Sequence, residues 1–392
     1  MIDTFDLKGE ISKLEFESLS QHFYLSKAER KNNPDLPEAL NEIAKRRGKE
    51  KVKPVSKQFN NIILNVRKFQ GLGNGEGRSP IFKITLSKVR FRSGNYHHFK
   101  YFLTLAIKPL ALLDEWESEF ETLAANQFCQ VEQGFDKARK KLKSENIIDI
   151  PDYFFSCAKV SRVDLTFDVD IPEDETNLYI ELLKKCDFNY YHKKAKKEPN
   201  PEHKGIRVGY RQFALNIYNK LTNQNTKRRD SQKTKNLRLE IQLYKAFFNS
   251  NRKYNKSGTE FFLLEEKDVI YIFNKMFNEL FKYCFKNGEY VTTQKAEKIV
   301  NNSFKHELKK KAITKILKSI ARKGIPETLK ECERGKIKVS GTSVTLAQCN
   351  TYLKELERLN INPITISKAL AAKYGADSLH NLNFYFQELK PD

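Results

Sequence analysis

The sequence predicts an α+β protein with two similar halves, each an antiparallel sheet flanked by helices, followed by a helical C-terminal region. Short runs that alternate apolar and polar residues, as strands do, occur in two groups along the chain. A segment with the charge order of a helix separates these groups, and the last third of the chain spaces its apolar residues as helices do. Strands in groups, rather than in strict alternation with helices, favour antiparallel sheets.

Four regions follow from this pattern. Residues 1–58 are polar and weakly periodic, and we expect a loosely ordered or helical arm there. The first half, 59–150, has strand-like runs near Asn61–Phe69, Ile81–Phe91 and Tyr101–Ile107, then a helix from Leu110 to about Leu142. The second half, 151–264, has a strand over Phe155–Asp170, a helix over Asp174–Lys185, and strands over Ile206–Lys220 and Leu237–Tyr244. Residues 265–392 form the helical region.

Composition and charge narrow the function classes. The 392 residues are 39% hydrophobic and 12% aromatic, which suits folded cores and excludes a disordered tail protein. The chain shows no apolar run long enough for a membrane span and no signal peptide. Six scattered cysteines without a CxxC pair favour a reducing compartment, so we expect a cytoplasmic protein with no membrane partner.

The positive charge is unevenly distributed. The excess is 71 − 49 = +22, of which 14 − 4 = +10 lies in Tyr190–Glu240 and 10 − 2 = +8 in Lys295–Lys323. Such an excess favours a polyanionic partner, most often nucleic acid. The alternative is a lysine-rich surface that only contacts water. The second segment spaces its apolar residues as one helix with a basic outer face, which suits contact with phosphates or with solvent alike.

The most informative segment is Ser161–Asp170. Its apolar residues alternate with polar ones, so that on a strand the two kinds face opposite sides. The polar side carries Arg162, Asp164, Thr166, Asp168 and Asp170. Like charges on one strand face repel unless water, an arginine or a cation neutralises them. The alternative is a solvent-facing strand that happens to carry several acids.

Two later segments repeat the alternation, Leu215–Lys220 and Leu237–Leu243. If all three strands share one sheet, four polar side chains converge on one face: Asp164, Asp168, Glu240 and Tyr218. Two or three carboxylates there make an oxygen-rich site suited to Mg²⁺ or Mn²⁺. A tyrosine beside a cation and lysines is a candidate nucleophile for attack on phosphorus.

These three segments, with Gly209–Gln212 between the first two, resemble in order and spacing the signature blocks of the rolling-circle replication initiators of plasmids and filamentous phages. The resemblance is sharp over about Ser161–Tyr244. It implies an enzyme that nicks one DNA strand at an origin hairpin and keeps a 5′-phosphotyrosine link. It further implies a single-stranded nick site, a host replicative helicase as partner, and a homodimer.

Carried over residue by residue, the resemblance puts the nucleophile at Tyr218 and the metal ligands at Asp164, Asp168 and Glu240. Arg162, Arg238 and Lys220 would contact phosphate or orient groups, and Tyr210 is a reserve nucleophile, with Tyr190 and Tyr191 after it. Further DNA contacts are expected from basic residues of the two charged segments: Arg207, Arg211, Lys227, Arg228, Arg229, Lys309, Lys310 and Lys311.

Two other functions stay open at this point, and a third fits the residues less well. A relaxase of a conjugative element uses the same chemistry, and the sequence does not separate it from a replication initiator. A DNA-binding regulator could keep the fold without the chemistry. A restriction-type nuclease could use Asp164 with Glu240 and Gln242, although that leaves Tyr218 without a role.

Overall fold

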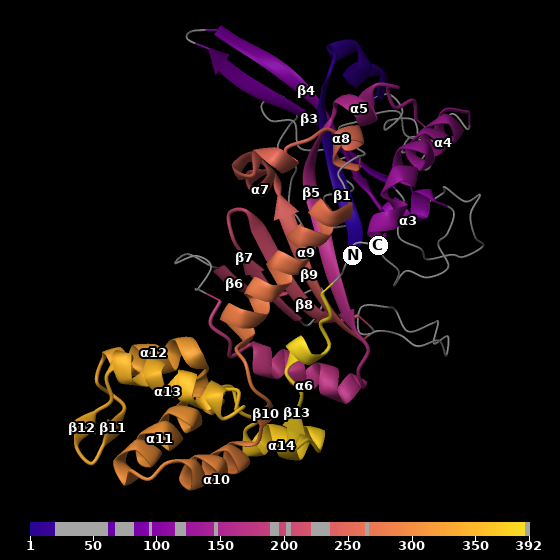
Figure 1. Cartoon of the computed structure of the whole chain (residues 1–392). Helices are drawn as coiled ribbons and strands as arrows, with labels where there is room; N and C mark the ends of the chain where they lie inside the picture. Colours follow the sequence, from indigo (N-terminus) through magenta and orange to yellow (C-terminus); the bar gives the residue numbers. More distant parts are fainter. Residues whose placement is uncertain are drawn as a thin grey trace, which may run out of the picture. The chain divides into compact units, whose positions relative to one another are not determined.

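The computed structural model describes residues 1–19, 62–66, 82–93, 96–113, 123–144, 148–188, 196–200, 205–220, 236–262 and 266–388. Internal contacts divide the chain into two compact units, residues 1–165 with 242–266, and residues 166–241 with 267–392. Each unit therefore combines two chain segments, unlike the consecutive regions expected from the sequence. Strands β5 (Lys159–Val169) and β9 (Leu237–Tyr244) pass from one unit into the other (Figure 1). The α+β class and the helical C-terminal region are confirmed.

The described strands follow the order β2-β3-β4-β1-β5-β9-β8-β7-β6. The first unit supplies β1 (Ile2–Ile11), β2 (Ile62–Val66), β3 (Phe82–Ser93) and β4 (Tyr96–Ile107). Strand β1 runs antiparallel to β4 on one side and to β5 on the other. Its Phe5 and Leu7 are fully buried.

The expectation of a loosely ordered or helical arm is therefore wrong for residues 2–11, whereas residues 13–19 are helical. Charged residues alternate with the apolar ones along this strand, which makes the segment read as polar although one of its faces enters the core. Residues 20–58 of the expected arm lie outside the described residues.

The expected helix over 110–142 is interrupted in the first unit. The described parts form α3 (Pro109–Leu112), the 3₁₀ turn η1 (Ala125–Gln130) and α4 (Val131–Ser144). Leu123 exchanges backbone hydrogen bonds of 3.1 and 2.9 Å with Ile2, so the chain is extended at that point and cannot be helical. Short helices complete this unit: α5 (Phe154–Cys157), α7 (Lys245–Ser250) and α8 (Gly258–Phe262), with the 3₁₀ turn η3 (Arg252–Tyr254).

The second unit holds the strands of the candidate site. The run expected as one strand over 206–220 is a hairpin of β7 (Gly205–Gly209) and β8 (Phe213–Asn219), with β6 (Lys196–Asn200) beside β7. Helix α6 (Glu173–Leu183) matches the expected helix. Helix α9 (Glu266–Leu280) packs on the apolar side of these strands, where the Phe277 and Phe167 rings lie 5.8 Å apart.

The C-terminal region continues the second unit (Figure 1). The basic segment expected as one helix is two helices, α10 (Thr293–Ser303) and α11 (Glu307–Lys323), because the backbone is extended at Phe304. The other elements are η4 (Phe281–Phe285, a π-helix), β10 (Tyr290–Val291), α12 (Ile325–Glu333), β11 (Lys338–Val339), β12 (Thr342–Ser343), α13 (Leu346–Arg358), α14 (Lys368–Tyr374), β13 (Ser378–Leu379) and η5 (Leu382–Phe384). Within the described ranges, no helix has the length and apolar character to cross a bilayer.

Candidate active site

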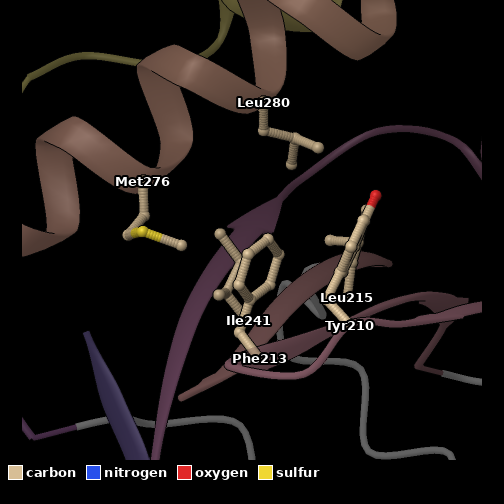
Figure 2. A pocket seen from close by; sticks show the side chains of 6 residues that line it. All are labelled: Tyr210, Phe213, Leu215, Ile241, Met276 and Leu280. Atoms are coloured by element: carbon tan, nitrogen blue, oxygen red, sulfur yellow. The ribbon is translucent and has the colours of Figure 1, made fainter. Parts of the chain in front are cut away.

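The two sides of β8 and β9 have different roles. Leu215 and Ile241 face α9 across a small apolar pocket of about 10 Å³, which Met276 and Leu280 of the helix also line (Figure 2). Because neighbouring residues of a strand point to opposite sides, Asn216 and Glu240 lie on the other side of the strands. The apolar pattern thus fixes which face of this part of the sheet can carry polar chemistry.

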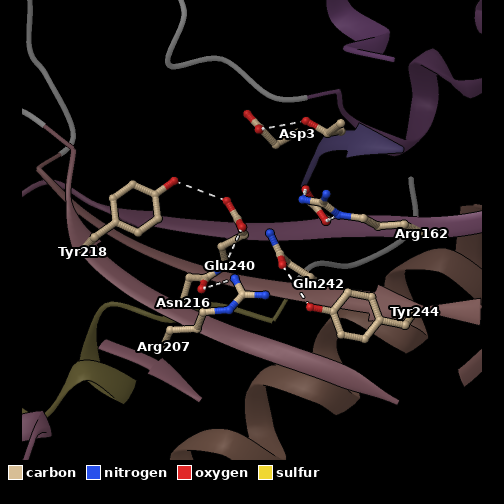
Figure 3. A network of polar contacts seen from close by, with 10 residues as sticks. Asp3, Arg162, Arg207, Asn216, Tyr218, Glu240, Gln242 and Tyr244 are labelled. Atoms are coloured by element: carbon tan, nitrogen blue, oxygen red, sulfur yellow. Dashed lines mark hydrogen bonds and ion pairs between the residues drawn. The ribbon is translucent and has the colours of Figure 1, made fainter. Parts of the chain in front are cut away.

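Tyr218 and Glu240 meet on that polar face. The Tyr218 hydroxyl donates to Oε2 of Glu240 at 3.2 Å, and the Asn216 amide donates to Oε1 at 2.9 Å (Figure 3). Nη1 of Arg207 in turn donates to Oδ1 of Asn216 at 2.9 Å. Glu240 is 7% exposed, whereas Tyr218 is half-buried. A partly accessible phenol is therefore held against a carboxylate that the neighbouring amide keeps in place.

A buried ion cluster lies among the same strands. Asp168 of β5 accepts from Nε and Nη2 of Arg238 at 2.6 and 2.7 Å, and from Nζ of Lys220 at 3.1 Å. Burial alone raises the pKa of the Asp168 carboxyl, but the Arg238 guanidinium and then the Lys220 ammonium outweigh it, so its pKa lies below the ordinary value. Asp168 is therefore an ionised carboxylate that pairs with two buried cations.

Arg162 and Asp164 form a separate pair on the part of β5 that belongs to the first unit. Nε and Nη2 of Arg162 donate to the two Asp164 oxygens at 2.7 and 2.5 Å. Asp164 is 2% exposed. The arginine two residues earlier on the same strand face neutralises this buried carboxylate. Of the three partners considered from the sequence, water, an arginine or a cation, Asp164 has the arginine.

The expected cation site requires that Asp164, Asp168 and Glu240 lie close together and can bind a metal ion. Asp164 and Asp168 each already accept two hydrogen bonds from a guanidinium. In the part of the chain that the structure describes, no three His, Cys, Asp or Glu residues are grouped closely enough to hold a metal ion. As they stand, Asp164 and Asp168 do not fit the expected Mg²⁺ or Mn²⁺ centre, because a cation would have to displace their arginines. We derive no reaction step through a metal.

Tyr210, the reserve nucleophile, lies on the apolar side. Its ring stacks on that of Phe213 with the ring centres 4.4 Å apart (Figure 2). Its hydroxyl donates to the carbonyl of Phe188 at 2.8 Å. Burial raises the pKa of this phenol far above its ordinary value. The hydroxyl proton of this buried phenol is donated to a neutral carbonyl rather than to a carboxylate, so Tyr210 is poorly placed to attack phosphorus. Tyr190 and Tyr191 lie outside the described residues.

The expected DNA-contacting residues have different surroundings. Arg211 is exposed in the turn between β7 and β8, whereas Arg207 is engaged with Asn216. In the C-terminal region, Lys309 binds Glu355 at 2.8 Å, Lys310 binds Glu307 at 2.7 Å, and Lys311 is exposed. Three of the expected DNA-contacting residues lie outside the described ranges: Lys227, Arg228 and Arg229.

The structure therefore groups the predicted site residues into separate contacts. Tyr218 joins Glu240, Lys220 and Arg238 join Asp168, and Arg162 joins Asp164. Asn216, which links Glu240 to Arg207, was not predicted as a site residue. Its position in the polar alternation of β8 was the only signal for it. Neither protein-family models, curated proteins nor solved structures gave a match to this chain.

Proposed function

We propose that this protein nicks and rejoins one strand of DNA through a covalent phosphotyrosine at Tyr218, and so starts rolling-circle replication of a plasmid or phage. One observation carries the proposal. The hydroxyl of Tyr218, the tyrosine of the resembling block, donates directly to a buried carboxylate of the next strand, Glu240, at 3.2 Å. A nucleophile within hydrogen-bonding distance of a base is the arrangement that covalent catalysis requires.

The proposed reaction balances with the chain's own residues. As the Tyr218 oxygen bonds to phosphorus, the phenol proton passes to Glu240. The bond from phosphorus to the DNA 3′-oxygen breaks, and a proton from Glu240 or water completes the 3′-hydroxyl. The reverse sequence rejoins the strand. Asn216 keeps Glu240 oriented throughout, and exposed cationic side chains such as Arg211 contact the neighbouring phosphates.

The ion cluster of Asp168, Arg238 and Lys220 has a positioning role in this proposal. It joins the ends of β5, β8 and β9 through buried charged hydrogen bonds, and Tyr218 and Glu240 are two residues from Lys220 and Arg238 along their strands. A divalent cation, which the resemblance implies, would have to exchange with Arg162 or Arg238. The reaction is therefore tested with Mg²⁺, with Mn²⁺ and with EDTA.

The experiment uses the full chain and a supercoiled plasmid that carries the DNA flanking its own gene. Open-circular product and an SDS-stable protein–DNA adduct are measured. Tyr218→Phe should lose both while DNA binding changes by less than about twofold, because only the nucleophilic oxygen is removed. Tyr210→Phe and Tyr244→Phe are matched controls that should keep both products. Tyr244 also lies at a strand of this sheet, but its hydroxyl binds a neutral amide, Gln242, at 3.2 Å.

The outcomes separate the competing functions. A covalent adduct that persists in Tyr218→Phe would remove this tyrosine from the mechanism. A wild-type protein that binds DNA but yields no open-circular product would be a regulator. A relaxase of a mobile element would perform the same reaction on a transfer origin, so plasmids carrying replication and transfer regions are compared. A cytoplasmic homodimer that works with a host replicative helicase belongs to the same proposal.

A further inference from the structure

A basic pocket lies in the C-terminal region, on a surface that the nicking chemistry does not use. Helix α11, the segment after α12 and strand β11 line an open pocket of about 590 Å³. Three cations of the pocket come from α11 and two from the chain around the hairpin: Lys315, Lys318, Arg322, Lys336 and Lys338. All five are exposed residues. Lys309 and Lys310, two cations expected from the sequence at the start of α11, instead bind Glu355 of α13 and Glu307.

The acidic residue in the pocket does not cancel this charge. Glu331 lines the pocket, but its carboxylate accepts hydrogen bonds from Lys323 and from the Ser319 hydroxyl. The hydrogen bond from Lys323 is the main cause that lowers the pKa of Glu331, so this residue stays ionised and engaged. The pocket therefore has five lysine or arginine side chains and one carboxylate, a formal charge of 5 − 1 = +4, and one of the five, Lys318, also binds Glu297 at 3.3 Å.

The cations sit on a packed support. Ile316 and Ile320 of α11 are fully buried, and Ser319 shares a 2.9 Å hydrogen bond with Thr328 of α12. The Lys315 ammonium donates to the backbone carbonyl of Lys338 at 2.5 Å, which fastens the hairpin to the helix. Because Lys315, Lys318 and Arg322 are three and four residues apart, they share one helix face over about 10 Å. A DNA strand presents a phosphate about every 3.4 Å of helix axis, so this row can meet several phosphates.

We propose that this pocket binds the sugar–phosphate backbone of duplex DNA. Single strands are generally bound by stacking their bases on aromatic rings. Among the described residues that line the pocket there is no aromatic side chain, only lysine, arginine, serine, glutamate and one isoleucine, Ile337. Such a surface recognises charge and leaves base pairs stacked. This inference goes beyond the proposed nicking reaction and does not require it.

The test measures binding of the full chain to a labelled 20-base-pair duplex of arbitrary sequence at several salt concentrations. The variant is Arg322→Gln with Lys336→Gln, two exposed pocket residues. Its matched control is Lys184→Gln with Lys330→Gln, which removes two charges from side chains bound to Glu181 and Glu327 outside the pocket. Thermal unfolding checks that all proteins are folded. Loss of two phosphate contacts should make the negative slope of log K against log salt shallower by about 1.8 in the pocket variant, and the control should keep the wild-type slope.

Three results would overturn the proposal. Equal slopes for the pocket variant and wild type would show that the pocket does not contact DNA. An equal loss in the control would show that overall charge, not the pocket, governs binding. A larger loss on a 20-nucleotide single strand than on the duplex would make single-stranded DNA the ligand. Adduct formation by the pocket variant on a short single-stranded substrate is measured in parallel, so that a failure of the nicking proposal is seen separately.

Discussion

Arg238 holds Asp168 with two hydrogen bonds of 2.6 and 2.7 Å, although 70 residues separate them in the chain. The side chains are 3% and 7% exposed, respectively. Asp168 also accepts from the buried Lys220, so the two cations together keep its carboxyl ionised. Breaking such a pair is costly, since the remaining charge stays buried without its partner.

Arg238→Ala should therefore lower the free energy of unfolding by about 3–5 kcal/mol, because Asp168 would be left buried with Lys220 alone. Urea denaturation at pH 7 measures this change. Arg211→Ala, which removes the same charge from an exposed turn, should stay within about 0.5 kcal/mol of wild type. A loss below about 1 kcal/mol for Arg238→Ala would contradict a stabilising role of the pair.

The pH dependence of stability should reveal the same carboxylate. Asp168 has a folded-state pKa below its ordinary value of 3.8, so it contributes stability above that value and loses it as pH falls through the folded pKa. Asp168→Asn lacks this titration. At pH 7 the variant should be less stable than wild type, and the difference should shrink between about pH 5 and pH 2. Urea denaturation across this range measures it, and a difference that stays constant with pH would refute the assignment.

Glu240→Gln should slow formation of the Tyr218 adduct by about 10²–10⁴-fold, because the amide cannot accept the phenol proton. The rate of adduct formation is measured by quenched time courses on a supercoiled plasmid or on an intact oligonucleotide that contains the nick site. The control is Glu173→Gln, which removes a carboxylate from the exposed first turn of α6. A normal rate in Glu240→Gln would mean that another group takes the proton.

Gly205 lies against the strand that carries Tyr218. A Cβ at this position would approach the Ile217 carbonyl oxygen to 2.1 Å and the Tyr218 Cβ to 2.8 Å, so β7 and β8 would have to separate. Gly205→Ala should cost about 1–3 kcal/mol of stability and reduce adduct formation.

Gly341→Ala is the comparison for Gly205→Ala. No atom lies within 4 Å of its added Cβ, and only its φ of +84° opposes the side chain. It should cost about 1 kcal/mol and leave adduct formation unchanged. Thermal unfolding and the adduct assay measure both variants, and full activity in Gly205→Ala would show that the spacing of β7 and β8 does not position Tyr218.

Much of the local structure followed from the sequence. The strict alternation of Ser161–Asp170 and Leu237–Leu243 predicted β5, β9 and their two faces, and Asp174–Lys185 predicted α6. The same reasoning failed for β1, whose charged residues hid its buried face, and for Phe304, where the chain leaves the helical conformation between α10 and α11. The spacing of apolar residues predicts the buried face of a segment only when the whole segment has one conformation.

By itself the sequence determined the α+β class, the concentration of positive charge, and which residues of each strand are polar. Tertiary structure alone decided their partners: the pairing of strands brought Tyr218 to Glu240 and Arg238 to Asp168. It also placed the basic pocket on Lys318, Arg322 and Lys336 rather than on the lysines at the start of α11. Alternation fixes the face of the sheet on which a side chain lies. Which charged group it contacts depends on strand register and helix packing between segments far apart in the chain, and a local sequence pattern carries no information about those contacts.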